Sequence, residues 1–122
     1  MGKDWRVAVA SLDGKVINEH FGRARAFYIF DITRDGTRIF RGERQVTPLC
    51  AGGEHTEQGM LESISALKDC TAVLVASIGT VARRALEINH ISVFEQPDLI
   101  EEALNKLTHY FIQSNYTVPE DK

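Results

Sequence analysis

The residues best suited to metal chemistry begin with a histidine in a predicted loop. His20 is followed by Phe21, Gly22 and Arg23, with Arg25 close behind. An imidazole nitrogen can bind iron, zinc or copper, the glycine can let backbone approach a bound group, and guanidinium groups suit an anionic ligand. The same residues also fit an ordinary surface loop with a hydrogen-bonded histidine, a turn glycine and solvated arginines.

A second predicted loop pairs a thiol with a histidine. Cys50 lies shortly before Gly52 and Gly53, and His55 follows five residues after the cysteine. Thiolate and imidazole suit iron, zinc or cuprous copper, and backbone N–H groups just before a helix favour an anion. The alternative is a glycine-rich loop with an incidental thiol and a polar residue before a helix. We expect this loop and the His20 stretch to converge on one ligand.

The remaining cysteine and histidines indicate structural roles. Cys70 follows Asp69 at the entry to an apolar run, which favours a buried core cysteine. His90 and His109 lie in or beside predicted helices and have no partner motif. The sequence has no Cys-x-x-Cys pair, P-loop, nucleophile elbow or dinucleotide fingerprint. We therefore expect neither a self-contained iron–sulfur site nor an enzyme.

Length and composition predict one domain over residues 1–113, followed by a flexible tail over 114–122. The 122 residues are 43% hydrophobic and 25% charged, with a formal net charge of −3. This balance gives no drive toward nucleic acid or an anionic membrane. With neither an apolar leader nor a spanning stretch, and only two cysteines, we expect a cytoplasmic protein with reduced thiols.

Hydrophobic periodicity predicts strands first and then alternating helices and strands. The predicted strands are 6–10, 27–32, 37–41, 71–76 and 91–94, and the predicted helices are 56–68, 80–88 and one opened by a capping box at Asp98. In the first helix the apolar residues recur at helical spacing: Met60, Leu61, Ile64 and Leu67. The inner face of the second is predicted to hold Val81, Ala82, Ala85 and Leu86, and the third is predicted to bury Ile100, Ala103, Leu104 and Leu107. This order predicts a mixed sheet covered by helices, with its ligand at strand ends.

The sequence resembles the dinitrogenase iron–molybdenum cofactor biosynthesis family, the type found as NifX and as the C-terminal domain of NifB. The resemblance runs from about Arg6 to Leu107. It rests on residues 18–24 followed by Phe27, on 47–50 with Gly52 and Gly53, on 67–70, on Ile78-Gly79 and on the helix start at 98–103.

The resemblance implies a three-layer ribonuclease H-like α/β fold with a five-stranded mixed sheet. It also implies transient binding of an iron–sulfur cluster or iron–molybdenum cofactor precursor, received from a donor protein and passed to an acceptor. His20 becomes the leading cluster contact, with Cys50 and His55 behind it. The cofactor-binding residues are then His20, Phe21, Gly22, Arg23, Cys50, Gly52 and Gly53. Few ligands and cationic neighbours suit a carrier that must release an anionic cluster.

Two other functions are alternatives to a carrier. A nuclease, suggested by the implied fold, needs clustered carboxylates that hold two divalent ions. The first predicted strand has no acidic residue, and Asp31 has no evident acidic partner in the sequence. A regulatory module that binds zinc or a protein partner through the same loops remains open.

Overall fold

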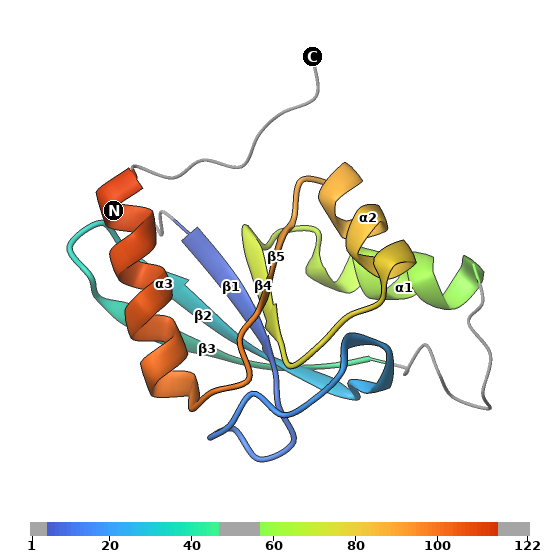
Figure 1. Ribbon diagram of the computed structural model, residues 1–122, viewed down its shortest axis with the longest axis horizontal. Coiled ribbons are helices and arrows are strands. Elements are labelled where there is room, and N and C mark those ends of the chain that lie inside the picture. The colour runs from blue at the N-terminus through green and yellow to red at the C-terminus, as the bar shows by residue number, and fades with distance from the viewer. Residues whose placement is uncertain (1–4, 47–56, 115–122) are drawn as a thin grey trace.

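Five strands form one mixed sheet within the part of the chain that the structure describes, residues 5–46 and 57–114 of a computed structural model (Figure 1). The strands are β1 (Trp5–Ala10), β2 (Ala26–Ile32), β3 (Arg38–Gln45), β4 (Ala72–Val75) and β5 (Ser92–Glu95). The helices are α1 (Glu57–Leu67), α2 (Thr80–Ile88), α3 (Ile100–Ser114) and the 3-10 turn η1 (Phe21–Arg23).

The sheet order β3-β2-β1-β4-β5 combines an antiparallel meander with two parallel crossovers. β1 pairs antiparallel with β2 and parallel with β4, and β4 pairs parallel with β5. The mixed sheet expected from the sequence is confirmed. Because the parallel strands β1, β4 and β5 end on the same side, the sheet has a carboxyl edge at Ala10, Val75 and Glu95 and an amino edge where these strands begin.

Helices cover both faces of the sheet. Alternation along β1 sends Val7 and Val9 into a core with α3, and Ala8 and Ala10 into a core with α1 and α2. The predicted inner residues of α3 are all buried. None of the helices in residues 5–46 and 57–114 is both long and apolar enough to cross a membrane.

The predicted inner face of α2 is wrong at one position, and one of the regularly spaced apolar residues of α1 faces solvent. Leu61 is 60% exposed and Val81 is 73% exposed, whereas Leu67, Ala82 and Leu86 are buried. Each of these two helices buries one stripe against the sheet, and Leu61 and Val81 lie outside that stripe.

The start of α3 also differs from the predicted capping box. Asp98 Oδ1 accepts from the adjacent Leu99 N–H at 2.8 Å, and the Ile100 N–H donates to the Lys15 carbonyl at 2.8 Å. Val16 forms an isolated bridge with Leu99. The β1–β2 connection therefore satisfies the helix start that local capping was expected to satisfy. Most of the predicted tail, residues 115–122, lies outside the described residues.

Candidate functional site

The His20 stretch is anchored by a buried aromatic ring. Phe21 is 2% exposed, and its ring lies 5.8 Å from that of Phe27, centroid to centroid. His20 itself is exposed and immediately precedes η1. Burial of Phe21 thus holds the turn while the neighbouring imidazole stays open to solvent.

The backbone of this stretch is attached to the residues that follow β4. The Phe21 N–H donates to the Ser77 carbonyl at 2.9 Å, and the Ala76 N–H donates to the Glu19 carbonyl at 3.0 Å. His20 and Ser77 form an isolated parallel bridge. These bonds place His20 at the carboxyl edge, where sheets of this kind bind ligands.

One ring nitrogen of His20 is occupied by a serine side chain. Nδ1 of His20 lies 2.5 Å from Oγ of Ser77. A hydrogen bond to one imidazole nitrogen fixes the ring and leaves the other nitrogen for a metal, as is usual for histidine ligands in proteins. Nε2 of His20 is therefore the atom suited to bind a metal.

Charges of both signs lie near His20: Glu19 precedes it directly, and other neighbouring groups favour an anion. α2 begins at Thr80, three residues after Ser77, and its N-terminal dipole favours negative charge nearby. Arg23 and Arg25 are exposed on the His20 stretch itself. The turn between Ser77 and α2 is held by Glu95, whose Oε2 accepts from the Ile78 N–H at 3.1 Å. The site can accept an anionic metal complex.

Only part of the predicted site falls within the described residues. Gly22 and Arg23 lie in η1 beside His20, as expected. Cys50, Gly52, Gly53 and His55 lie outside the described residues, so their convergence with His20 stays a prediction. Within residues 5–46 and 57–114, no three His, Cys, Asp or Glu side chains group together as a metal site.

Cys70 is a buried core residue, as the sequence predicts. It is 4% exposed, and burial raises the pKa of its thiol to about 12. The residue lies at the amino edge, just before β4. A thiol in this state is a poor metal ligand because the thiolate is the form that binds.

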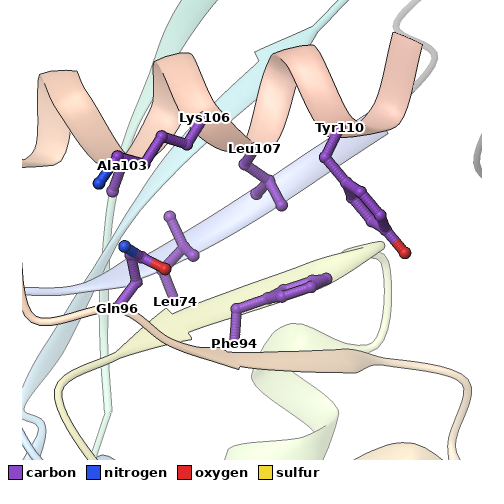
Figure 2. Close-up of a pocket in the computed structure, with 7 residues that line it drawn as sticks. All are labelled: Leu74, Phe94, Gln96, Ala103, Lys106, Leu107 and Tyr110. Atoms are coloured by element: carbon purple, nitrogen blue, oxygen red, sulfur yellow. The ribbon is translucent and has the colours of Figure 1, made fainter. Parts of the chain in front are cut away.

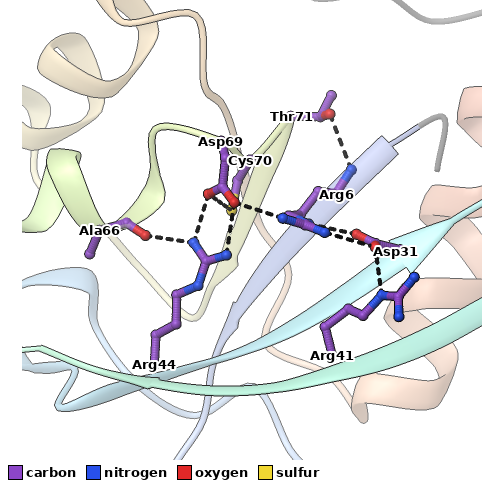
Figure 3. A network of polar contacts seen from close by, with 8 residues as sticks. All are labelled: Arg6, Asp31, Arg41, Arg44, Ala66, Asp69, Cys70 and Thr71. Atoms are coloured by element: carbon purple, nitrogen blue, oxygen red, sulfur yellow. Dashed lines mark hydrogen bonds and ion pairs between the residues drawn. The ribbon is translucent and has the colours of Figure 1, made fainter. Parts of the chain in front are cut away.

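Asp31 is engaged by arginines rather than by a second carboxylate (Figure 3). Arg6 Nε donates to Asp31 Oδ1 at 2.7 Å, and Arg41 Nε donates to Asp31 Oδ2 at 2.8 Å. These two guanidinium groups hold the pKa of the Asp31 carboxyl below its usual range, against the opposing effect of burial. Asp31 is therefore an ion-pair residue whose two carboxylate oxygens are both engaged by arginines.

An apolar pocket of about 260 Å³ lies between α3 and the strands β4 and β5 (Figure 2). Its lining consists of Leu74, Phe94, Gln96, Ala103, Lys106, Leu107 and Tyr110. None of these described lining residues is a cysteine, histidine or carboxylate. The pocket supplies no ligand for a metal cluster and does not belong to the His20 site.

Ser77 is the site residue that sequence reasoning missed. It is 57 residues from His20 in the chain. The available signal was the Ser77-Ile78-Gly79 run between a strand and a helix, because the ends of parallel strands are where such sheets bind ligands.

The chain is similar to a known protein family and to several named relatives. The family model described as dinitrogenase iron–molybdenum cofactor matches residues 3–110. The FeMo cofactor biosynthesis protein NifB of Herbaspirillum seropedicae is 34% identical over 109 residues, which cover 89% of this chain and 19% of that protein. NifB of Azotobacter vinelandii is 41% identical over 76 residues, 60% of this chain and 15% of that protein.

Two solved structures share the fold. The crystal structure of PH0822 matches with a TM-score of 0.66 and 25% identity, covering 86% of this chain and 89% of that one. The NMR structure of TM1290 from Thermotoga matches with a TM-score of 0.60 and 19% identity, covering 97% and 99%.

The two kinds of match differ in how much of each protein they cover. The chain spans about a fifth of the length of the Herbaspirillum relative, so the match concerns one region of that protein. The family model, by contrast, covers most of this chain. The chain therefore belongs to the dinitrogenase iron–molybdenum cofactor family.

Proposed function

We propose that this protein is a non-enzymatic carrier that transiently binds an iron–sulfur cluster or an iron–molybdenum cofactor precursor during metallocluster assembly. Nε2 of His20 binds an iron of the cluster. The observation that carries the proposal is the exposed imidazole at the carboxyl edge with Nδ1 held by Ser77 at 2.5 Å. Family membership and the names of the NifB relatives support the class of cargo.

The open surroundings of His20 suit a carrier. A cluster held by few protein ligands keeps its other iron positions accessible, so an acceptor protein can displace those ligands without breaking a closed cage. The exposed Arg23 and the N-terminus of α2 attract an anionic cluster over distance. In this proposal Cys50 and His55 supply further ligands, Gly52 and Gly53 give close backbone approach, and donor and acceptor proteins are the partners.

The proposal includes a ribonuclease H-like fold without nuclease activity. The order β3-β2-β1-β4-β5 and helices on both faces support that fold assignment. Against nuclease activity stands Asp31, whose two carboxylate oxygens are taken by Arg6 and Arg41.

Anaerobic reconstitution with iron and sulfide tests the proposal. The parent protein, His20→Ala and His109→Ala are incubated alike and then compared by bound iron and sulfide and by visible absorption. His109→Ala is the matched control because His109 is also exposed but lies on α3. We expect the parent and His109→Ala to take up a cluster, and His20→Ala to lose most of that uptake.

Two results would contradict the carrier proposal or part of it. Equal uptake by His20→Ala and the parent would exclude His20 as the iron ligand. A parent protein that takes up no cluster, yet holds stoichiometric zinc as purified, would favour the alternative of a zinc- or partner-binding regulatory module. Cys50→Ala and His55→Ala in the same assay test whether those residues share the ligand set.

A further inference from the structure

We infer that Ser77 is a positioning residue that sets which nitrogen of His20 faces the metal cluster. The inference rests on the proposed function, because it concerns how the proposed ligand is prepared. The observation that supports it is the 2.5 Å contact between Ser77 Oγ and His20 Nδ1.

The backbone keeps these two side chains together. On either side of the contact, the Ala76 N–H donates to the Glu19 carbonyl at 3.0 Å and the Phe21 N–H donates to the Ser77 carbonyl at 2.9 Å. The Ile78 N–H, directly after Ser77, donates to Glu95 Oε2 at 3.1 Å. The serine and the histidine thus meet on a fixed frame rather than through two mobile loops.

The hydroxyl of Ser77 is not used for helix capping. Serine shortly before a helix commonly caps it by accepting from a first-turn N–H. Here the N-cap of α2 is Gly79, and the described residues provide no side-chain cap at that position. The recorded partner of Ser77 Oγ is the imidazole. The arrangement therefore commits the hydroxyl to His20.

The contact at Nδ1 bears on which imidazole nitrogen is available to a metal. A neutral imidazole carries one proton, and a metal can bind only the nitrogen that lacks it. When Nε2 binds iron, Nδ1 carries the proton and donates a hydrogen bond to Ser77 Oγ. In the metal-free protein the hydroxyl can accept from Nδ1–H or donate to a bare Nδ1, so the contact suits either tautomer. What the contact fixes is the orientation of the ring, with Nδ1 toward Ser77 and Nε2 away from it, and without the hydroxyl the ring loses this restraint.

NMR of the metal-free protein tests the contact without any cluster. The protein is labelled with ¹⁵N-histidine, and the nitrogen shifts of His20 are compared in the parent, Ser77→Ala, Ser77→Thr and Ser65→Ala. Ser65 is the matched control because it is an exposed serine on α1. We expect the Nδ1 shift of His20 to change in Ser77→Ala, which loses the hydrogen bond at that nitrogen, and to stay like the parent's in Ser77→Thr and Ser65→Ala. An unchanged Nδ1 shift in Ser77→Ala would overturn the inference.

Cluster binding by the same variants tests its functional meaning. Loss of a hydrogen bond to a ligating histidine costs roughly 10–100-fold in metal affinity. We expect that loss for a reconstituted [4Fe–4S] cluster in Ser77→Ala, with recovery in Ser77→Thr. Parent-like binding by Ser77→Ala would overturn the positioning role. If the parent itself binds no cluster, the proposed function fails, while the Nδ1 shift of the metal-free protein still decides the Ser77–His20 contact.

Discussion

Arg6 and Asp31 form a bidentate ion pair across neighbouring strands, with Nε 2.7 Å from Oδ1 and Nη2 2.9 Å from Oδ2 (Figure 3). Asp31 is 1% exposed, so its charge is balanced by this pair and by Arg41. Arg6 also reaches Asp69, which in turn binds Arg44. The network joins β1, β2 and β3 to the turn before β4, at the amino edge and away from the His20 site.

Removing the charge of Asp31 should destabilise the fold. Asp31→Asn leaves Arg6 and Arg41 facing a neutral amide in a buried position, and breaking such a pair from one side commonly costs several kcal/mol. Because Arg6 keeps Asp69 and Arg41 is half exposed, we expect about 3 kcal/mol, at the low end of that range. Urea unfolding followed by circular dichroism measures the loss.

The control for this variant is an exposed ion pair on the same protein. Glu101 pairs with Arg38 at 3.3 Å, and its side chain is 83% exposed. Exposed pairs contribute at most about 1 kcal/mol, so Glu101→Gln should stay close to the parent. Equal losses of unfolding free energy in the two variants would mean that the buried ion pair of Asp31 stabilises the fold no more than the exposed pair of Glu101.

Stability should fall in acid because two carboxyls of this network have lowered pKa values. Hydrogen bonds from Arg6 lower the pKa of Asp31, and hydrogen bonds from Arg44 lower that of Asp69, each from a usual value of 3.8. Between the folded and unfolded pKa values the unfolded chain binds more protons, so stability decreases as the pH falls. We expect a constant free energy of unfolding from pH 7 to 5, and a decline below about pH 4.

The two aspartates can be identified as the source of that decline. Urea unfolding of the parent, Asp31→Asn and Asp69→Asn at several pH values between 7 and 2.5 gives the slope for each protein. Each substitution should flatten the acid slope, since the neutral amide does not titrate. A slope that both variants leave unchanged would assign the acid sensitivity to other carboxyls.

Cys70 should be nearly inert in the native protein. Its pKa of about 12, compared with 9.0 for an unperturbed thiol, reduces the thiolate fraction at neutral pH by about a thousandfold. Iodoacetamide labelling with peptide mass mapping should therefore modify Cys70 in urea but scarcely under native conditions. Native labelling as fast as in urea would contradict the buried position.

The sequence predicts helices and strands well where the flanking residues and the spacing of apolar residues agree. α2 covers the predicted residues 80–88, since Gly79 precedes it and its apolar spacing is regular. Most other predicted elements begin or end within about two residues of the observed bounds, but β3 continues to Gln45, four residues beyond the predicted end of that strand at residue 41. In the His-Phe-Gly stretch the structure shows an exposed imidazole beside a buried ring, and the predicted role of His20 as a metal ligand stays a proposal.

The sequence could not predict which distant residues pair. The Ser77–His20 contact needs the crossover that places the end of β4 beside the His20 stretch. The Arg6–Asp31 pair needs the β1–β2 register, in which these two residues lie opposite each other. Local composition determines neither strand register nor the position of a crossover. The arginine partners of Asp31 could therefore not be predicted, and the role of Ser77 was only weakly indicated.

Two apolar residues of α2 show where the predicted inner face differs from the face that is buried. Leu86 is fully buried, whereas Val81, predicted on the same face, is exposed. Leu86→Ala should cost about 3 kcal/mol through lost burial and a residual cavity, and Val81→Ala should cost less than about 0.5 kcal/mol. Urea unfolding of both variants checks this. Similar losses would place Val81 in the core and restore the face predicted from spacing, because only a buried side chain leaves a cavity when it is truncated.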